Sequence, residues 1–228
     1  MLISIEKILP APALADLRAA LSSADAPWVD GRITAGYQGA AVKFNQQLDD
    51  ASALALQWRR VVVAALERHP GFISATLPNA LYPPMFNRYG EGMTFGPHVD
   101  GSIRIDPASG RKLRTDVSAT LFLNDPQEYD GGEVRIHDQY GAHAVKGAAG
   151  DLVVYPATSL HQVAPITRGV RLACVFWVQS LVRDDAQRAL LFDMDTAIQR
   201  LNQQAADEPA RQLLVGCYHN LLRQWADT

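Results

Sequence analysis

The chain has 228 residues, enough for one sizeable domain with a hydrophobic core or for such a domain with a small appendage. Hydrophobic residues make up 48% of it and charged residues 20%, which is ordinary for a globular protein, and no segment is repetitive. The formal net charge is −3, with acidic and basic residues mixed throughout. Because no basic stripe is present to neutralise phosphates, nucleic acid is not an expected partner.

The first residues and the cysteines bear on where the protein works. The first ten residues lack a basic stretch followed by an apolar run and a small-residue cleavage site, and no apolar run approaches membrane-spanning length. We therefore expect a cytoplasmic protein with no membrane partner. Cys174 and Cys217 have neither CxxC spacing nor the density of a disulfide framework, so both are expected to be buried small hydrophobic residues.

Residues 1–80 are expected to form a strand and a helical buttress of the same domain. Residues 2–9 alternate apolar and polar side chains as a strand does, and residues 10–21 repeat apolar side chains at helical spacing. Residues 31–45 contain several glycines and short β-type runs. A second helical pattern covers residues 50–71, from a capping Asp-Ala-Ser run to a terminating His-Pro-Gly run.

Residues 81–180 change to short β-type runs separated by Gly, Pro and Asp. The expected strands are 85–89, 115–123, 133–137, 142–145, 151–155, 161–166 and 170–179. In the second of these, apolar residues on one face alternate with Asp116, Ser118, Thr120 and Phe122 on the other, so one face is expected to meet the core and the other a cavity. This pattern favours a double-stranded β-helix, or jelly roll, within an α+β fold.

Residues 181–228 are expected to be a C-terminal helical extension. Apolar residues at helical spacing predict two helices hinged around Asp207-Glu208-Pro209. Their apolar faces need a partner surface. We expect them to pack on the chain's own domain, and a homodimer through the same helices is left open.

Three residues are candidates for one metal site: His98, Asp100 and His161. In an extended chain, side chains at i and i+2 share a face, so His98 and Asp100 can converge on one ion, and His161 lies in an expected strand that can supply a third ligand. Two imidazoles and one carboxylate leave octahedral positions open for O2 and a co-substrate, which suits Fe(II). The alternative is a chance HxD pair and a histidine hydrogen-bonded in the core. The other histidines have no comparable setting and are not assigned as ligands: His69, His137, His143 and His219.

Arg171 is the candidate for binding an anionic co-substrate. Residues 170–179 have two largely apolar faces, so this strand is expected to be central and Arg171 to be buried. A buried guanidinium is costly unless an anion meets it, and its planar fork pairs with a carboxylate. The distal carboxylate of 2-oxoglutarate meets that need, and an internal salt bridge is the alternative. A turn at residues 167–169, with Arg168 in solvent, is expected to bring the strands of His161 and Arg171 to one pocket.

Together these residues resemble the PKHD-type hydroxylases of the Fe(II)/2-oxoglutarate dioxygenase superfamily, within the branch of prolyl 4-hydroxylase and procollagen-lysine hydroxylase catalytic domains. The motifs that carry the resemblance are Asn87-Arg88-Tyr89-Gly90, Pro97-His98-Val99-Asp100, Leu121-Phe122-Leu123-Asn124, Gly131-Gly132-Glu133, Gly150-Asp151-Leu152, His161 and Arg171. The buttress and the helical tail resemble the same bacterial group, so the resemblance covers nearly the whole chain.

The resemblance implies that His98, Asp100 and His161 bind Fe(II) and that Arg171 binds 2-oxoglutarate. Tyr89 matches a tyrosine that reaches into the 2-oxoglutarate pocket of related hydroxylases, and its alternative role is an aromatic residue packed in the core. L-Ascorbate dependence is implied too, since a reductant rescues iron oxidised in uncoupled turnovers. Many collagen-type prolyl hydroxylases have lysine where this chain has Arg171, so the resemblance does not carry the substrate with it.

The implied reaction is hydroxylation of a C–H bond with O2, releasing succinate and CO2. A peptide and a small molecule are equally open as substrates, and residues 101–113 are expected to form a lid over the site. Two competing functions remain at this stage. One is a cupin-like metal-binding module with no role for Arg171, and the other is a zinc hydrolase, although no HExxH helix or general base accompanies the three ligands.

Overall fold

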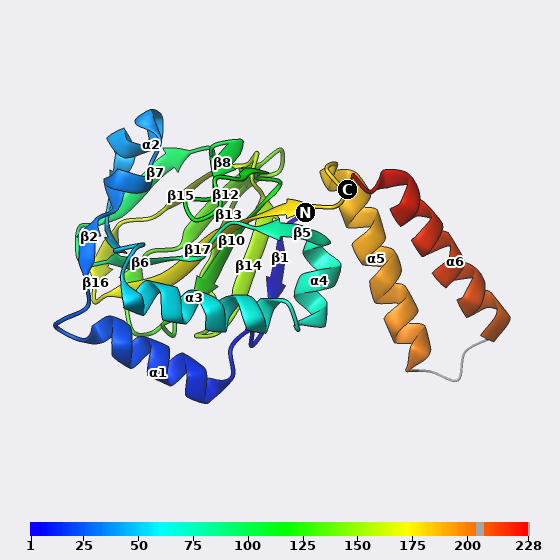
Figure 1. Ribbon diagram of the computed structural model, residues 1–228, viewed down its shortest axis with the longest axis horizontal. Coiled ribbons are helices and arrows are strands. Elements are labelled where there is room, and N and C mark those ends of the chain that lie inside the picture. The colour runs from blue at the N-terminus through cyan, green and yellow to red at the C-terminus, as the bar shows by residue number, and fades with distance from the viewer. Residues whose placement is uncertain (204–207, 228) are drawn as a thin grey trace.

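The computed structural model describes residues 1–203 and 208–227 and has a β-sheet core, helices packed along one side of it, and a helical pair that projects from one end (Figure 1). The larger sheet has eight strands in the order β1-β14-β10-β17-β6-β4-β2, and β5 also pairs with β17. Its strands are β1 (Ile3–Ile5), β2 (Trp28–Asp30), β4 (Gln46–Leu48), β5 (Pro78–Leu81), β6 (Met85–Tyr89), β10 (Val117–Phe122), β14 (Leu152–Pro156) and β17 (Arg171–Ser180). All of its pairings are antiparallel.

The smaller sheet has five strands in the order β13-β12-β15-β7-β3. They are β3 (Lys43–Phe44), β7 (Thr94–His98), β12 (Val134–Asp138), β13 (Gly141–Val145) and β15 (Leu160–Val163). Two short ribbons complete the β structure: β8 (Ile103–Ile105) with β9 (Lys112–Arg114), and β11 (Asp130–Gly131) with β16 (Ile166–Arg168). Phe122 and Tyr155 of the larger sheet pack with Val134 and Ile136 of the smaller one, so the two sheets face each other as in a jelly roll.

The alternation expected in the second strand is confirmed in β10. Val117, Ala119 and Leu121 enter the main hydrophobic core, whereas Ser118 on the opposite face lines a cavity. Strand β17 alternates in the same way, because Cys174 joins the main core and Arg171 lies on the other face. The larger sheet therefore has one face against helices and one against the functional site.

The helical buttress covers the core face of the larger sheet. Its helices are α1 (Ala11–Ser22), α3 (Ala53–Leu66) and α4 (Pro70–Thr76), which lie along one side of the core in Figure 1. Ser52 caps α3 by accepting a hydrogen bond from the Ala55 amide. The expected helical end near residues 69–71 is wrong in detail, because α3 ends at Leu66 and His69 caps a separate helix that begins with Pro70.

Other expectations for local structure are also corrected. The strand expected at residues 2–9 covers only Ile3–Ile5. Residues 31–45 contain the 3-10 helix η1 (Gly31–Thr34), helix α2 (Tyr37–Val42) and the short strand β3. The strand expected at residues 161–166 ends at Val163, and the chain pairs again only as β16. Pro165 has no amide hydrogen to continue the ladder. The expected strands also omitted β7, although it carries a site residue.

The tail consists of α5 (Asp185–Asn202) and α6 (Glu208–Trp225), the two helices projecting at one end in Figure 1. Helix α5 packs on the chain's own domain, where Leu191 forms a cluster with Leu77 and Val182. Part of the expected hinge, Asp207, lies outside the described residues, while Glu208 and Pro209 begin α6. Cys174 is buried as expected, but Cys217 is exposed on α6, because its helix face does not meet the core. No helix within the described ranges is long and apolar enough to cross a membrane.

Candidate metal centre and co-substrate pocket

His98, Asp100 and His161 converge on one point. His98 ends β7 and is the direct cross-strand partner of His161 in β15, while Asp100 follows two residues later. One ligand atom from each of the three lies within 4.8 Å of the others. The Nε2 atoms of His98 and His161 are 3.9 and 3.6 Å from the Asp100 carboxylate oxygens. Within residues 1–203 and 208–227 no second group of this kind is found, and the four unassigned histidines lie outside this one.

Hydrogen bonds orient both imidazole rings toward that point. The Nδ1 atom of His98 lies 2.8 Å from the Gly96 carbonyl oxygen, and the Nδ1 atom of His161 lies 3.0 Å from the Ser159 carbonyl oxygen. A carbonyl only accepts, so each Nδ1 carries the hydrogen and donates it. Each Nε2 then presents a lone pair to the group, which is the arrangement that metal-binding histidines require.

The carboxylate of Asp100 is held by a neighbouring strand. The Ser118 hydroxyl, on the cavity face of β10, donates to Asp100 Oδ2 at 2.6 Å. Burial, followed by the nearby His161, lowers the pKa of His98, so its ring is neutral near pH 7. A neutral imidazole beside a buried carboxylate is the donor set that a divalent cation binds, and these residues fit an iron ion.

Arg171 begins β17 on the facing sheet, where it pairs with Tyr89 of β6. Its side chain is 1% exposed, and its Nε and Nη2 atoms have no hydrogen-bond partner in the described structure. The rings of Tyr89 and Phe122 flank the guanidinium at 5.3 and 5.7 Å. No internal salt bridge joins it to a carboxylate of the described residues, so that alternative is not observed. A buried guanidinium with two unpartnered nitrogens fits the distal carboxylate of 2-oxoglutarate.

The glycine pair 131–132 makes room for this arginine. Gly132 has φ +70°, and a Cβ there would lie 2.9 Å from Arg171 Cδ and 2.5 Å from Ile166 Cδ1. Gly131 has φ +75°, and its Cβ would lie 1.9 Å from the Pro165 carbonyl oxygen. Both positions therefore require glycine: Gly132 because it packs against Arg171, and Gly131 because it packs against the Pro165 backbone.

The route that brings iron ligands and Arg171 together differs from the expected turn. Strands β15 and β17 do not pair, since they belong to opposite sheets. Arg168 ends β16 and is exposed as expected, where it forms an ion pair with Asp130 at 2.7 Å. His161 and Arg171 thus approach each other across the two sheets and not along a hairpin.

Tyr89 has features of both roles considered for it. It is 2% exposed and packs with Tyr129, Val163 and Ile166, yet it also lines the cavity. Burial raises its pKa, so the phenol keeps its proton. It is a core residue at the cavity wall, and its position beside Arg171 is compatible with contact to a co-substrate.

Sequence reasoning missed three site residues. Ser118 holds Asp100. Tyr155 lines the cavity with its ring 5.0 Å from that of His161, and its phenol is buried. Tyr129 is 1% exposed and has a hydroxyl without a partner among the described residues. The alternation of β10 was a usable signal for Ser118, whereas nothing in the sequence distinguishes these tyrosines from core aromatics.

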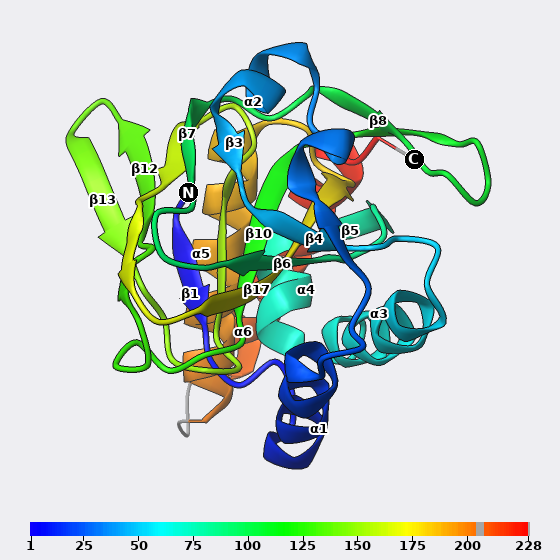
Figure 2. The same ribbon diagram turned by 90° about the vertical axis from the view of Figure 1, so that its left-hand side faces the viewer.

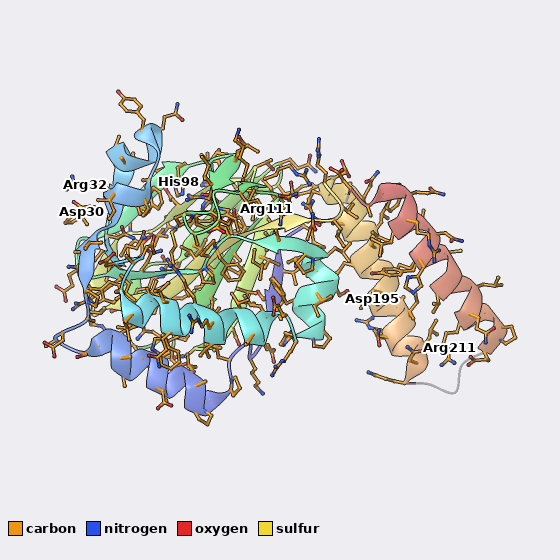
Figure 3. All side chains as sticks on the ribbon, in the orientation of Figure 1. Asp30, Arg32, His98, Arg111, Asp195 and Arg211 are labelled. Atoms are coloured by element: carbon orange, nitrogen blue, oxygen red, sulfur yellow. The ribbon has the colours of Figure 1, made fainter. Side chains whose placement is uncertain are left out.

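A cavity of about 770 Å³ contains the metal group and opens to the outside. Figure 3 shows His98 in the β core, whereas the labelled Asp195 and Arg211 lie on the distant helical pair. The walls come from both sheets, and its rim includes Tyr37 of α2 and Ile103 and Ile105 of β8. Figure 2 shows α2 and the β8 hairpin at the same edge of the molecule. The volume suits a small ligand or one peptide segment.

Comparison with known proteins gives the family. The model of the 2OG-Fe(II) oxygenase superfamily matches residues 84–179, and that of the PKHD-type hydroxylase C-terminal domain matches residues 185–227. A PKHD-type hydroxylase from Cupriavidus metallidurans is 69% identical over 228 residues, which is 100% of both chains. This chain belongs to the PKHD-type hydroxylases. Another PKHD-type hydroxylase, from Caulobacter vibrioides, is 53% identical over the same length. The chain is thus an oxidoreductase of the dioxygenase class, which decides against the zinc hydrolase and the non-catalytic module.

Solved structures agree with the jelly-roll fold. A prolyl-4-hydroxylase from Pseudomonas putida has a TM-score of 0.54 and 24% identity, over 78% of this chain and 92% of that one. A prolyl hydroxylase from Trichoplax adhaerens, solved with a peptide fragment of the hypoxia inducible factor oxygen degradation domain, has a TM-score of 0.56 and 15% identity, over 83% and 86% of the two chains.

Proposed function

We propose that this PKHD-type hydroxylase uses Fe(II), 2-oxoglutarate and O2 to hydroxylate a small-molecule or peptide substrate. His98, Asp100 and His161 are the proposed iron ligands, and Arg171 is the proposed anchor of 2-oxoglutarate. The observation that carries the proposal is the combination of a converging ligand group with a buried guanidinium that has two unpartnered nitrogens. When bound, iron and 2-oxoglutarate supply the oxidation of a C–H bond by O2, with release of succinate and CO2.

The protein's own contribution at the metal is orientation. The Gly96 and Ser159 carbonyls fix the two rings, and Ser118 restrains one carboxylate oxygen. Because all three ligands come from one side, the remaining positions face the cavity. Binding energy is therefore not spent on rotating the ligands into place.

The contribution at Arg171 is a buried positive charge beside Tyr89, which itself lines the cavity. Tyr89, Phe122 and Tyr129 surround the guanidinium and exclude water from it. A carboxylate that reaches this point gains charge-assisted hydrogen bonds that water does not provide. Tyr89 is the proposed neighbour of the bound co-substrate, because it both lines the cavity and lies beside Arg171.

The hairpin of β8 and β9 is the proposed lid. Ile103 and Ile105 are more than half exposed although they line the cavity rim. An apolar hairpin at a cavity mouth can close over a substrate and exclude water during turnover. L-Ascorbate is the proposed reductant that restores iron oxidised in turnovers without substrate.

The test is metal analysis of anaerobically purified protein, followed by titration with 2-oxoglutarate. We expect one iron per chain and a visible charge-transfer band that saturates with 2-oxoglutarate. Iron-loaded protein that gives no band contradicts the role of the co-substrate. Incubation with 2-oxoglutarate and O2 should then inactivate the enzyme, and L-ascorbate should restore it; unrestored activity contradicts the role of ascorbate.

A further inference from the structure

Two cations, Lys43 and Arg104, line the cavity. Lys43 of β3 is 7% exposed, whereas its neighbour Phe44 is 55% exposed. Arg104 of β8 is partly buried, whereas its neighbours Ile103 and Ile105 are 54% and 59% exposed. Each charged side chain is thus more buried than the apolar side chains next to it, although Ile103 and Ile105 also reach the cavity rim. This is the reverse of the usual partition and indicates a ligand for the charges.

Neither cation forms a salt bridge with a carboxylate among residues 1–203 and 208–227, although the more distant charges of Asp100, Asp50 and Asp30 oppose the lowering of the Lys43 pKa. Lys43 Nζ donates one hydrogen bond, to Thr34 Oγ1 at 3.3 Å. The Arg104 guanidinium lies 3.5 Å from the ring centroid of Trp177, and its buried Nε has no hydrogen-bond partner among the described residues. Within the described cavity wall the sole acidic residue is Asp100, which the metal group already uses.

The two charges also act on each other. Burial first, and then the charge of Arg104, lower the pKa of Lys43 to about 8. Two like charges lining one cavity destabilise each other, and an anion bound near both relieves that repulsion. They are separate from the 2-oxoglutarate anchor, because Arg171 lies in β17 beside Tyr89 and is not among the residues that line the cavity.

We propose that Lys43 and Arg104 bind a carboxylate of the substrate, so that this enzyme hydroxylates carboxylate-bearing molecules. That the bound molecule is hydroxylated rests on the proposed function, whereas carboxylate binding by Lys43 and Arg104 does not. A planar carboxylate matches the fork of Arg104, and Lys43 supplies a second charge. The apolar part of the substrate then lies along the aromatic and aliphatic wall that includes Phe95, Val99 and Trp177.

The test is calorimetry with benzoate, phenylacetate and 3-phenylpropionate, each compared with its primary amide. The protein is loaded anaerobically with Fe(II) and 2-oxoglutarate, and the titrations are repeated without either. At least one acid should bind about tenfold or more tightly than its amide. Arg104→Met and Lys43→Met should each remove that preference, and Arg104→Lys should restore part of it. Arg111→Met is the matched control, since Arg111 is exposed on the same hairpin (Figure 3).

The outcomes separate this site from the co-substrate site. The charge-transfer titration with 2-oxoglutarate should be unchanged in the Arg104 and Lys43 variants. If no acid binds more tightly than its amide, or if Arg171→Ala abolishes the preference while Arg104→Met keeps it, the proposal is overturned. If the wild type gives no charge-transfer band, the proposed function is contradicted. The calorimetry without Fe(II) and 2-oxoglutarate still decides whether Lys43 and Arg104 bind a carboxylate. If acetyl-Gly-Gly-Phe with a free carboxylate binds as tightly as the small acids and its amide does not bind, Lys43 and Arg104 are supported as the site, and the carboxylate is that of a peptide C-terminus.

Discussion

The metal group on the smaller sheet and Arg171 on the larger sheet differ in how their polar atoms are partnered. Both histidines have a backbone acceptor at Nδ1, and Asp100 has the Ser118 hydroxyl. Two nitrogens of Arg171 have no partner in the described structure. The metal ligands are therefore organised before metal binds, whereas the guanidinium is satisfied only by a ligand.

The difference teaches how the two halves of the site should respond to change. Removing a ligand from the metal group removes a bond to iron and leaves the sheet pairing intact. Removing Arg171 removes an unpartnered charge, so the loss should appear only when 2-oxoglutarate is present. Three changes test this contrast, in order of decreasing effect, and a fourth, in the tail, should leave both halves of the site unchanged.

The largest expected effect is loss of iron. His98→Ala or His161→Ala should reduce bound Fe(II) to about a tenth or less, because two remaining ligands hold the ion poorly. The jelly roll should stay folded, since these rings lie at the cavity and not in the main core. Metal analysis and circular dichroism measure the two outcomes. His143→Ala is the control, because this exposed histidine of the same sheet lies outside the metal group and pairs with Asp138. Unchanged iron content in both site variants would falsify the ligand assignment.

The next largest effect is expected at Arg171, where substitution should lower the affinity for 2-oxoglutarate and leave iron binding unchanged. Arg171→Ala should weaken 2-oxoglutarate by well over tenfold, since losing one partner of a buried charge pair costs about 2–5 kcal/mol. Iron affinity should remain nearly unchanged. The charge-transfer titration measures the first and metal analysis the second. Arg168→Ala is the control, as Arg168 is exposed and paired with Asp130. Loss of 2-oxoglutarate binding in the control alone would mean that the wrong arginine was assigned.

Ser118→Ala should weaken Fe(II) binding, but less than the loss of a metal ligand does. The substitution removes the 2.6 Å hydrogen bond to Asp100 Oδ2 and leaves the ligand itself in place. We expect a loss of about 10- to 100-fold in Fe(II) affinity, with 2-oxoglutarate binding to the loaded enzyme unchanged. Competition against a chelator measures it. Thr120→Val is a comparison on the same strand face, and an equal loss there would show that polarity of the strand, not this hydrogen bond, matters.

The smallest effect concerns the tail and leaves both halves of the site untouched. We propose that exposed leucines of α5 and α6 contact a second copy of the chain, since Leu190 is 58% and Leu213 72% exposed. Leu213→Glu should shift a dimer toward monomer by about tenfold in dissociation constant. Light scattering measures it, with Leu56→Glu on α3 as control. A wild-type monomer at all concentrations contradicts the proposal.

Some features of this protein were determined by the sequence itself. The period-2 pattern of β10 and β17 predicts which faces meet the core, because side chains alternate across any strand. The HxD spacing places His98 and Asp100 on one side for the same reason. Helix α3 was also predictable, since its cap and apolar stripe are local signals.

Only the tertiary structure decided how the pieces meet. The cross-strand pairing of His161 with His98, and the placement of Arg171 on the opposite sheet, depend on long-range strand order that no local pattern encodes. The exposure of Cys217 follows from which surface its helix meets. The inward turn of Lys43 and Arg104 is of the same kind: a short strand has the same local pattern in either orientation, and the cavity between the sheets decides which face is buried.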